Sequence, residues 1–217
     1  MEKNTVFLVL GFFCVICLSG CGKNRENPPS QVILEGEYKV EGVENIVFTF
    51  YEDSTLKVEQ SGIYDFDKNS QGKDLLKMCF DDTSRELPED YNFTDYLVEC
   101  DRRYVYLTLD TDQTWNLDPQ EKPKPMALRL LKGSEGISKG RPFSGTYQIG
   151  REGSDYLYIF SKDKTVLMQI HENYYIEGEK LTLSDSSGST DYKYELTENQ
   201  VKINNLLGEN ILSLVKK

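Results

Sequence analysis

The stretch "IVFTFYEDSTLKV" at residues 46–58 recurs as "YLYIFSKDKTVLM" at residues 156–168. In both copies, apolar side chains occupy every second position on either side of a short polar segment that contains Asp53 or Asp163. Alternation with this period is typical of a strand that buries one face. Acidic and small residues between two such runs favour a tight turn. The sequence therefore predicts a β-hairpin that is used twice.

The duplication extends outward from the hairpins in both directions. Upstream, "LEGEYKV" at 34–40 matches "FSGTYQI" at 143–149, and downstream Tyr64 matches Tyr174 in nearly the same register. Self-similarity at a constant spacing indicates a repeated structural unit.

Two β domains are therefore expected, and a short linker should separate them. The first repeat covers residues 33–132 and the second covers 143–217. Residues 133–142 are rich in glycine and charge, which is typical of a linker between domains.

Each repeat contains several short strand candidates. In the second repeat, turn-forming residues separate most of them, and the candidates are 144–149, 155–161, 165–170, 172–176, 179–184, 190–196, 199–204 and 210–216. The first repeat gives the same count, with longer loops around 81–95 and 111–125. No segment shows a sustained apolar period of 3.6 residues. We expect an all-β protein with two tandem small antiparallel β-barrels or meanders. The alternative is that both halves close into one larger barrel or one continuous sheet.

Three features of the repeats resemble small lipocalin-like domains found in lipoproteins of Gram-positive bacteria. These are the Gly-x-Tyr openings at Gly36 and Gly145, the hairpins with Asp-x-Thr in their turns, and the terminal strands "ALRLLKG" and "ILSLVKK". Tyr38 and Tyr147 stand where fuller lipocalins carry tryptophan. The resemblance implies a barrel whose loops or interior could bind a ligand.

The N-terminal segment has the pattern of an export signal. The apolar run "TVFLVLGFFCVIC" at 5–17 follows Lys3 and is shorter than the roughly 20 residues that a membrane-spanning helix needs. "LSGC" at 18–21 resembles the bacterial lipobox, which implies cleavage between Gly20 and Cys21 and a diacylglycerol group on the Cys21 thiol. Two acyl chains anchor a protein stably, because each buried methylene contributes about 0.8 kcal/mol. The alternatives are an uncleaved amphiphilic N-terminus or an ordinary signal peptide.

Residues 1–20 are thus expected to be a lipoprotein signal peptide, and residues 21–32 a lipidated cysteine and flexible tether. The tether contains "GKNRENPPSQ", which has no large apolar side chain and cannot form a core. The formal net charge is -11. A protein surface with this negative charge is repelled by nucleic acid and by anionic lipids. We expect a protein that is lipid-anchored at the extracytoplasmic face of a bacterial membrane and binds no nucleic acid.

The sequence offers no clear catalytic or metal site. His171 is the only histidine, so a histidine-based metal triad cannot form. Asp65, Asp67 and Asn69 alternate as calcium ligands would, but Ser70 stands where an EF-hand turn requires glycine, and no glutamate follows at the twelfth position. We expect a solvated turn there, with no metal, cofactor or catalytic residue.

Cys79 and Cys100 allow two arrangements. If a hairpin turns at residues 88–91, the two thiols lie opposite each other and can form a disulfide. If the loop at 81–95 is irregular instead, Cys79 lies beside the loop and Cys100 several residues away along the next strand.

A long acidic loop carries Asp110, Asp112 and Trp115, which form a candidate ligand or partner surface. A surface aromatic among acidic groups could bind carbohydrate or peptide, although Trp115 could also pack over the mouth of a barrel.

Two classes of function follow from these observations. The first is a non-catalytic binding or interaction module whose ligand is a small apolar molecule, a glycan or another protein. The second is an envelope hydrolase that uses loop carboxylates, although no spacing singles out a pair.

Overall fold

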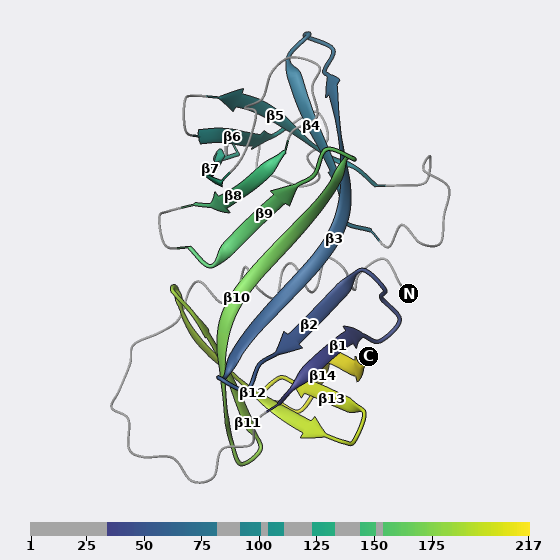
Figure 1. Ribbon diagram of the computed structural model, residues 1–217, viewed down its shortest axis with the longest axis vertical. Coiled ribbons are helices and arrows are strands. Elements are labelled where there is room, and N and C mark those ends of the chain that lie inside the picture. Colours follow the sequence, from purple (N-terminus) through teal and green to yellow (C-terminus); the bar gives the residue numbers. More distant parts are fainter. Residues whose placement is uncertain (1–33, 82–91, 101–103, 111–122, 133–143, 151–153) are drawn as a thin grey trace. The chain divides into compact units, whose positions relative to one another are not determined.

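The computed structural model describes residues 34–81, 92–100, 104–110, 123–132, 144–150 and 154–217 (Figure 1). The expected signal peptide at 1–20, the tether at 21–32 and the linker at 133–142 lie outside these residues. The described residues form fourteen strands and no helix. The strands are β1 (Gly36–Val40), β2 (Ile46–Phe50), β3 (Thr55–Lys68), β4 (Asp74–Cys79), β5 (Thr94–Cys100), β6 (Tyr104–Leu109), β7 (Met126–Lys132), β8 (Gly145–Ile149), β9 (Tyr156–Phe160), β10 (Thr165–Glu177), β11 (Lys180–Asp185), β12 (Gly188–Leu196), β13 (Gln200–Asn204) and β14 (Asn210–Lys216). Within the same ranges, no helix is long and apolar enough to cross a membrane.

Hydrogen-bonded neighbours follow one another around a closed ring of antiparallel strands. Each strand pairs with the next along the chain, β14 pairs with β1, and β3 also pairs with β10. The prediction of an all-β, antiparallel, barrel-like fold is confirmed. The strand order also agrees with the alternative in which both halves share one continuous sheet.

One predicted strand break is wrong. Residues 165–170 and 172–176 were expected to form two strands, but they belong to the single strand β10. His171 is exposed while Ile170 and Glu172 on either side are buried, so the alternation runs on without interruption. β10 and its counterpart β3 have 13 and 14 residues and are the two longest strands (Figure 1). The described part of each repeat therefore contains seven strands rather than eight.

The chain divides into two compact units, and their boundaries lie inside β3 and β10. Among the described residues, unit 1 contains those up to Glu59 together with Ile170–Lys217, and unit 2 contains Gln60–Gln169. The repeats expected at 33–132 and 143–217 divide the chain differently. Each unit consequently draws strands from both repeats.

Each unit has an aromatic core built from equivalent residues. In unit 1, Phe50 makes edge-to-face contacts with Tyr38 and Tyr174, with ring centroids 5.5 and 5.2 Å apart. In unit 2, Phe160 makes the same kind of contact with Tyr147 and Tyr64 at 5.8 and 5.1 Å. Such pairs contribute about 0.5–1.5 kcal/mol each beyond the area they bury.

The two repeated hairpin turns have the same geometry. Asp53 Oδ1 accepts hydrogen bonds from the Thr55 backbone N–H at 3.1 Å and from its hydroxyl at 2.6 Å. Asp163 Oδ1 accepts the equivalent bonds from Thr165 at 3.1 and 2.7 Å. The intervening residues, Ser54 and Lys164, have φ angles of 65° and 68°, a left-handed conformation that a tight turn requires. The two turns thus use the same hydrogen bonds, which explains the Asp-x-Thr pattern in both.

Candidate functional site

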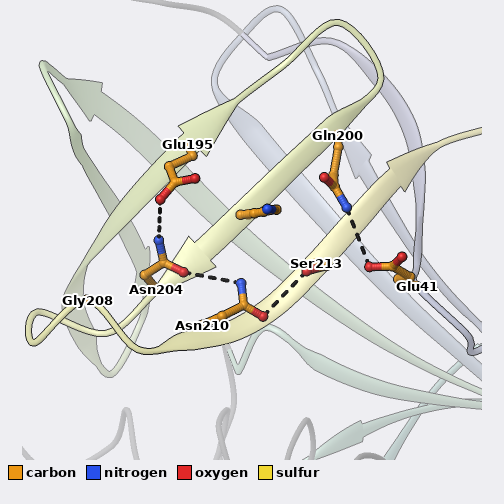
Figure 2. A pocket seen from close by; sticks show the side chains of 8 residues that line it. Glu41, Glu195, Gln200, Asn204, Gly208, Asn210 and Ser213 are labelled. Atoms are coloured by element: carbon orange, nitrogen blue, oxygen red, sulfur yellow. Dashed lines mark hydrogen bonds between the residues drawn. The ribbon is translucent and has the colours of Figure 1, made fainter.

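A polar hollow of about 520 Å³ lies on unit 1 (Figure 2). Its lining contains carboxylates, amides, a hydroxyl, an ammonium group and one glycine. The lining residues are Glu41, Glu195, Gln200, Lys202, Asn204, Gly208, Asn210 and Ser213. Most of them come from the three neighbouring strands β12, β13 and β14 and from the turn between the last two.

Alternation along β13 explains why polar side chains gather on this face. Val201 and Ile203 are buried in the core of unit 1, so Gln200, Lys202 and Asn204 project from the opposite face. The registers place Glu195 of β12 and Ser213 of β14 on either side of Lys202. The row across the three strands is therefore carboxylate, ammonium and hydroxyl.

Glu41 completes this row from the end of β1. Its backbone N–H donates to the carbonyl of Ser213 at 2.9 Å, which fixes its position beside β14. Gln200 Nε2 donates to Glu41 Oε2 at 3.4 Å (Figure 2).

A chain of side-chain hydrogen bonds orients the amides of the hollow. Asn204 Nδ2 donates to Glu195 Oε1 at 3.3 Å, and its Oδ1 accepts from Asn210 Nδ2 at 3.2 Å. Ser213 Oγ donates to Asn210 Oδ1 at 3.4 Å (Figure 2). The Asn210–Asn204 distance is at the upper limit of the usual range and the other two exceed it, so these bonds are weak. They align the side chains without using all of their capacity, because an amide has two donor hydrogens and an oxygen with two lone pairs.

The Lys202 ammonium adds a positive charge to the middle of the row. Within the ranges that the structure describes, Lys202 forms no salt bridge, although Glu195 stands opposite it in the register. The hollow can therefore donate strong hydrogen bonds from Lys202 and accept them at Glu41 and Glu195.

A hydrogen-bonded turn at one end of the hollow carries two exposed leucines. Asn205 holds the turn, since its Oδ1 accepts from the Glu209 N–H at 2.9 Å and its carbonyl accepts from the Gly208 N–H at 2.9 Å. Leu206 and Leu207 are 60% and 87% exposed. The polar lining thus adjoins a small apolar tip.

The acidic surface expected around Asp110 has a different environment. Asp110 is 8% exposed, and its backbone N–H donates to the carbonyl of Asp95 at 2.9 Å. Burial raises the pKa of Asp95 above its ordinary value, the charges of Asp110 and Asp67 add to this effect, and Lys77 opposes it. Asp110 is thus buried where the expected surface begins. Asp112 and Trp115 lie outside the described residues.

Cys79 is buried, Cys100 is exposed, and the two are not bonded to each other. The register of β4 with β5 pairs Leu75 with Leu97 and Met78 with Thr94. The two cysteines therefore lie toward opposite ends of this strand pair. The disulfide alternative is not realised, and the arrangement is the one in which Cys79 lies at the end of its strand and Cys100 lies further along the next.

The segment considered as a calcium loop contains the end of β3, with Asp65 and Asp67, and the turn at 69–73 that leads to β4. Asp65 accepts a hydrogen bond from Lys164 at 2.7 Å, and Asn69 Oδ1 accepts from the backbone N–H groups of Gln71 and Lys73 at 3.0 Å each. Over the described ranges, no group of three or more histidine, cysteine, aspartate or glutamate side chains could hold a metal ion.

Sequence reasoning missed the polar hollow, although a signal was present. Asparagine is depleted in strands, yet Asn204 and Asn210 fall within the segments predicted as strands 199–204 and 210–216. Amides at strand ends on neighbouring strands are unusual enough to mark a face for inspection. Only the register shows that they meet Glu195 and Lys202.

No protein-family model, curated protein or solved structure matches this chain.

Proposed function

We propose that this chain is a non-catalytic binding module on the extracytoplasmic face of a bacterial membrane, anchored through a lipid on Cys21, and that its polar hollow binds a glycan. The observation that carries the binding part is the lining of the hollow. All eight lining residues are polar or glycine, and no large apolar side chain is among them.

This lining favours a hydroxyl-rich ligand over a small apolar one. Pockets for apolar ligands are lined mainly by hydrophobic and aromatic side chains. Sugar hydroxyls both donate and accept hydrogen bonds, and the amides of Gln200, Asn204 and Asn210 do the same. The volume falls within the range of about 300–1,000 Å³ that is common for ligand sites.

The proposal includes the finer fold assignment, a duplicated lipocalin-like unit. Support comes from the equivalent turns at Asp53 and Asp163 and from the equivalent aromatic clusters around Phe50 and Phe160. The anchor rests on the lipobox-like sequence that ends at Cys21.

The binding part is tested with an array of bacterial envelope oligosaccharides, followed by calorimetric titration of the strongest binder. We expect Lys202→Ala to weaken binding about tenfold or more, since a hydrogen bond to a charged group contributes about 1.5–3 kcal/mol. Gln200→Ala should weaken binding about two- to tenfold, since a hydrogen bond between neutral groups contributes about 0.5–1.5 kcal/mol. Lys193→Ala is the matched control, because Lys193 is exposed on the adjacent strand β12 but does not line the hollow. Binding that is unchanged in both hollow variants, or an array without any binder, contradicts the proposal.

A hydrolase would behave differently in the same assay. Glycoside hydrolysis commonly uses two carboxyl groups, and the hollow contains Glu41 and Glu195. Product analysis by mass spectrometry during the titration would reveal cleavage. Turnover that Glu41→Gln or Glu195→Gln abolishes, with binding retained, would replace the non-catalytic proposal with the hydrolase.

The anchor is tested separately by the intact mass and fractionation of the exported protein. We expect a mature chain that begins at Cys21, carries a diacylglycerol mass and stays with the membrane. Cys21→Ser should lose both the lipid mass and the membrane association. An unmodified, membrane-free wild-type protein would exclude the anchor but would leave the glycan proposal in place.

A further inference from the structure

One tyrosine of each repeat donates a hydrogen bond from its hydroxyl to the hairpin turn of the other repeat. Tyr174 of the second repeat donates from its hydroxyl to the carbonyls of Leu34 and Tyr51 in the first, at 2.6 and 3.0 Å. Tyr64 of the first repeat donates to the carbonyl of Ser161 in the second at 2.7 Å. Ser161 occupies the position in its hairpin that Tyr51 occupies in the other. In each unit, therefore, a tyrosine of one repeat is hydrogen-bonded to the hairpin of the other repeat.

The backbone repeats this exchange beside the same two turns. The Tyr174 N–H donates to the carbonyl of Ser54 at 2.9 Å, and the Tyr64 N–H donates to the carbonyl of Lys164 at 2.9 Å. Ser54 and Lys164 are the two left-handed turn residues. In both units, therefore, β3 or β10 of one repeat extends the sheet from the first hairpin of the other repeat.

The aromatic cores are shared in the same way. Tyr174 completes the cluster that Tyr38 and Phe50 begin in unit 1, and Tyr64 completes the cluster of Tyr147 and Phe160 in unit 2. Tyr64 and Tyr174 are each 2% exposed. Each cluster thus takes two of its rings from one repeat and the third ring from the other repeat.

In each unit, a further pair of hydrogen-bonded strands also joins one repeat to the other. In unit 1, β14 pairs with β1, for example Leu214 with Val40. In unit 2, β7 pairs with β8, for example Leu128 with Ile149. Each unit thus contains the first strands of one repeat and the last strands of the other.

From these four observations we infer that the two repeats have exchanged halves and are obligate binding partners of each other. In each unit, the first strands of one repeat, with their hairpin, form a sheet and core with the long strand and the last strands of the other repeat. The covalent connection at residues 133–142 is not what keeps them together.

The test is to cut the intact protein between its repeats. A protease recognition site that the chain lacks elsewhere replaces part of residues 134–141, and the full chain is purified and then cleaved. We expect the two fragments to elute together in native buffer and to separate only in denaturant. The melting temperature of the cut protein should fall on tenfold dilution, because unfolding then also dissociates the halves, while that of the uncut protein should not change.

Self-contained tandem repeats give the opposite result. Fragments that separate in native buffer, each with its own cooperative melting transition, would overturn the inference. Precipitation of either fragment after the cut would do the same, because exchanged halves keep each other's apolar faces covered.

A pair of substitutions separates specific exchange from general adhesion of the fragments. In the cut protein, Tyr64→Phe with Tyr174→Phe removes only the two hydroxyls that reach the opposite hairpins. We expect a larger dissociated fraction at a given dilution than in the cut parent. Tyr175→Phe is the control, because Tyr175 adjoins Tyr174 on β10 but is only half-buried on the other face. Equal dissociation in the two variants would contradict the assignment of these contacts.

Discussion

A single aspartate in each hairpin sets both the shape of the turn and its response to acid. Hydrogen bonds from the Thr55 hydroxyl and, next, from its backbone N–H lower the pKa of Asp53, and Thr165 lowers the pKa of Asp163 in the same way. A carboxyl group whose pKa is lowered in the folded state stabilises that state above its unfolded pKa, which is about 3.9. This stabilisation is lost as the pH falls through the lower, folded value.

We therefore expect Asp53→Asn with Asp163→Asn to flatten the acid limb of the stability curve. Asparagine can still accept the turn hydrogen bonds through Oδ1 but does not titrate in this range. The melting temperature, followed by circular dichroism from neutral pH to well below about pH 4, should fall less steeply in the double variant. Glu52→Gln, an exposed neighbour in the same turn, is the control. Parallel acid limbs for the double variant and the wild type would contradict this account.

Sequence patterns predict these turns because their chemistry is local. The aspartate and threonine of each turn are two residues apart, so a short window contains the whole motif. The polar hollow is different, since Glu41, Glu195 and Asn210 meet only through strand register. Nor does the sequence show the environment of Asp110, which lies beside a long loop and is 8% exposed.

At the scale of the strand, β14 provides a clear test of the inward and outward faces. Leu214 is fully buried between Val40 and Val201, whereas its neighbour Val215 is 38% exposed beside Lys39 and Gln200. We expect Leu214→Ala to lower the free energy of unfolding by about 2–5 kcal/mol through lost burial and a cavity. Val215→Ala should cost less than about 1 kcal/mol. Urea denaturation measures both, and similar losses would show that the strand register is misassigned.

Most strands could be predicted from the sequence, but their continuity could not. The segments predicted at 199–204 and 210–216 correspond closely to β13 and β14. The break expected near His171 does not exist, because an alternating pattern looks the same whether a strand ends or continues into new surroundings. The expected break at His171 lies beside the boundary between Gln169 and Ile170, where β10 passes from one compact unit to the other. The wrong prediction therefore concerns a place where the alternation of apolar residues does not distinguish one long strand from two short ones.

At the scale of the whole molecule, the chain divides into two compact units whose boundaries differ from those of the expected repeats. Each unit contains residues from both expected repeats. Pairing within a repeat and pairing between repeats use the same residues, however, since Tyr64 and Tyr174 are equivalent and either could serve either hairpin. Sequence similarity between the copies thus hides which copy completes which unit.

The pairing of β1 with β14 has a consequence for the newborn chain. Tyr38 of β1 can pair with Lys216 of β14 only after almost the whole described chain has been synthesised. At a synthesis rate of about 5–20 residues per second, the first strand waits roughly 10–35 s with an unpaired edge. Such an edge can pair with another copy of the chain during that interval. The strong negative charge of the protein, -11 over its length, makes nascent copies repel one another while they are still incomplete.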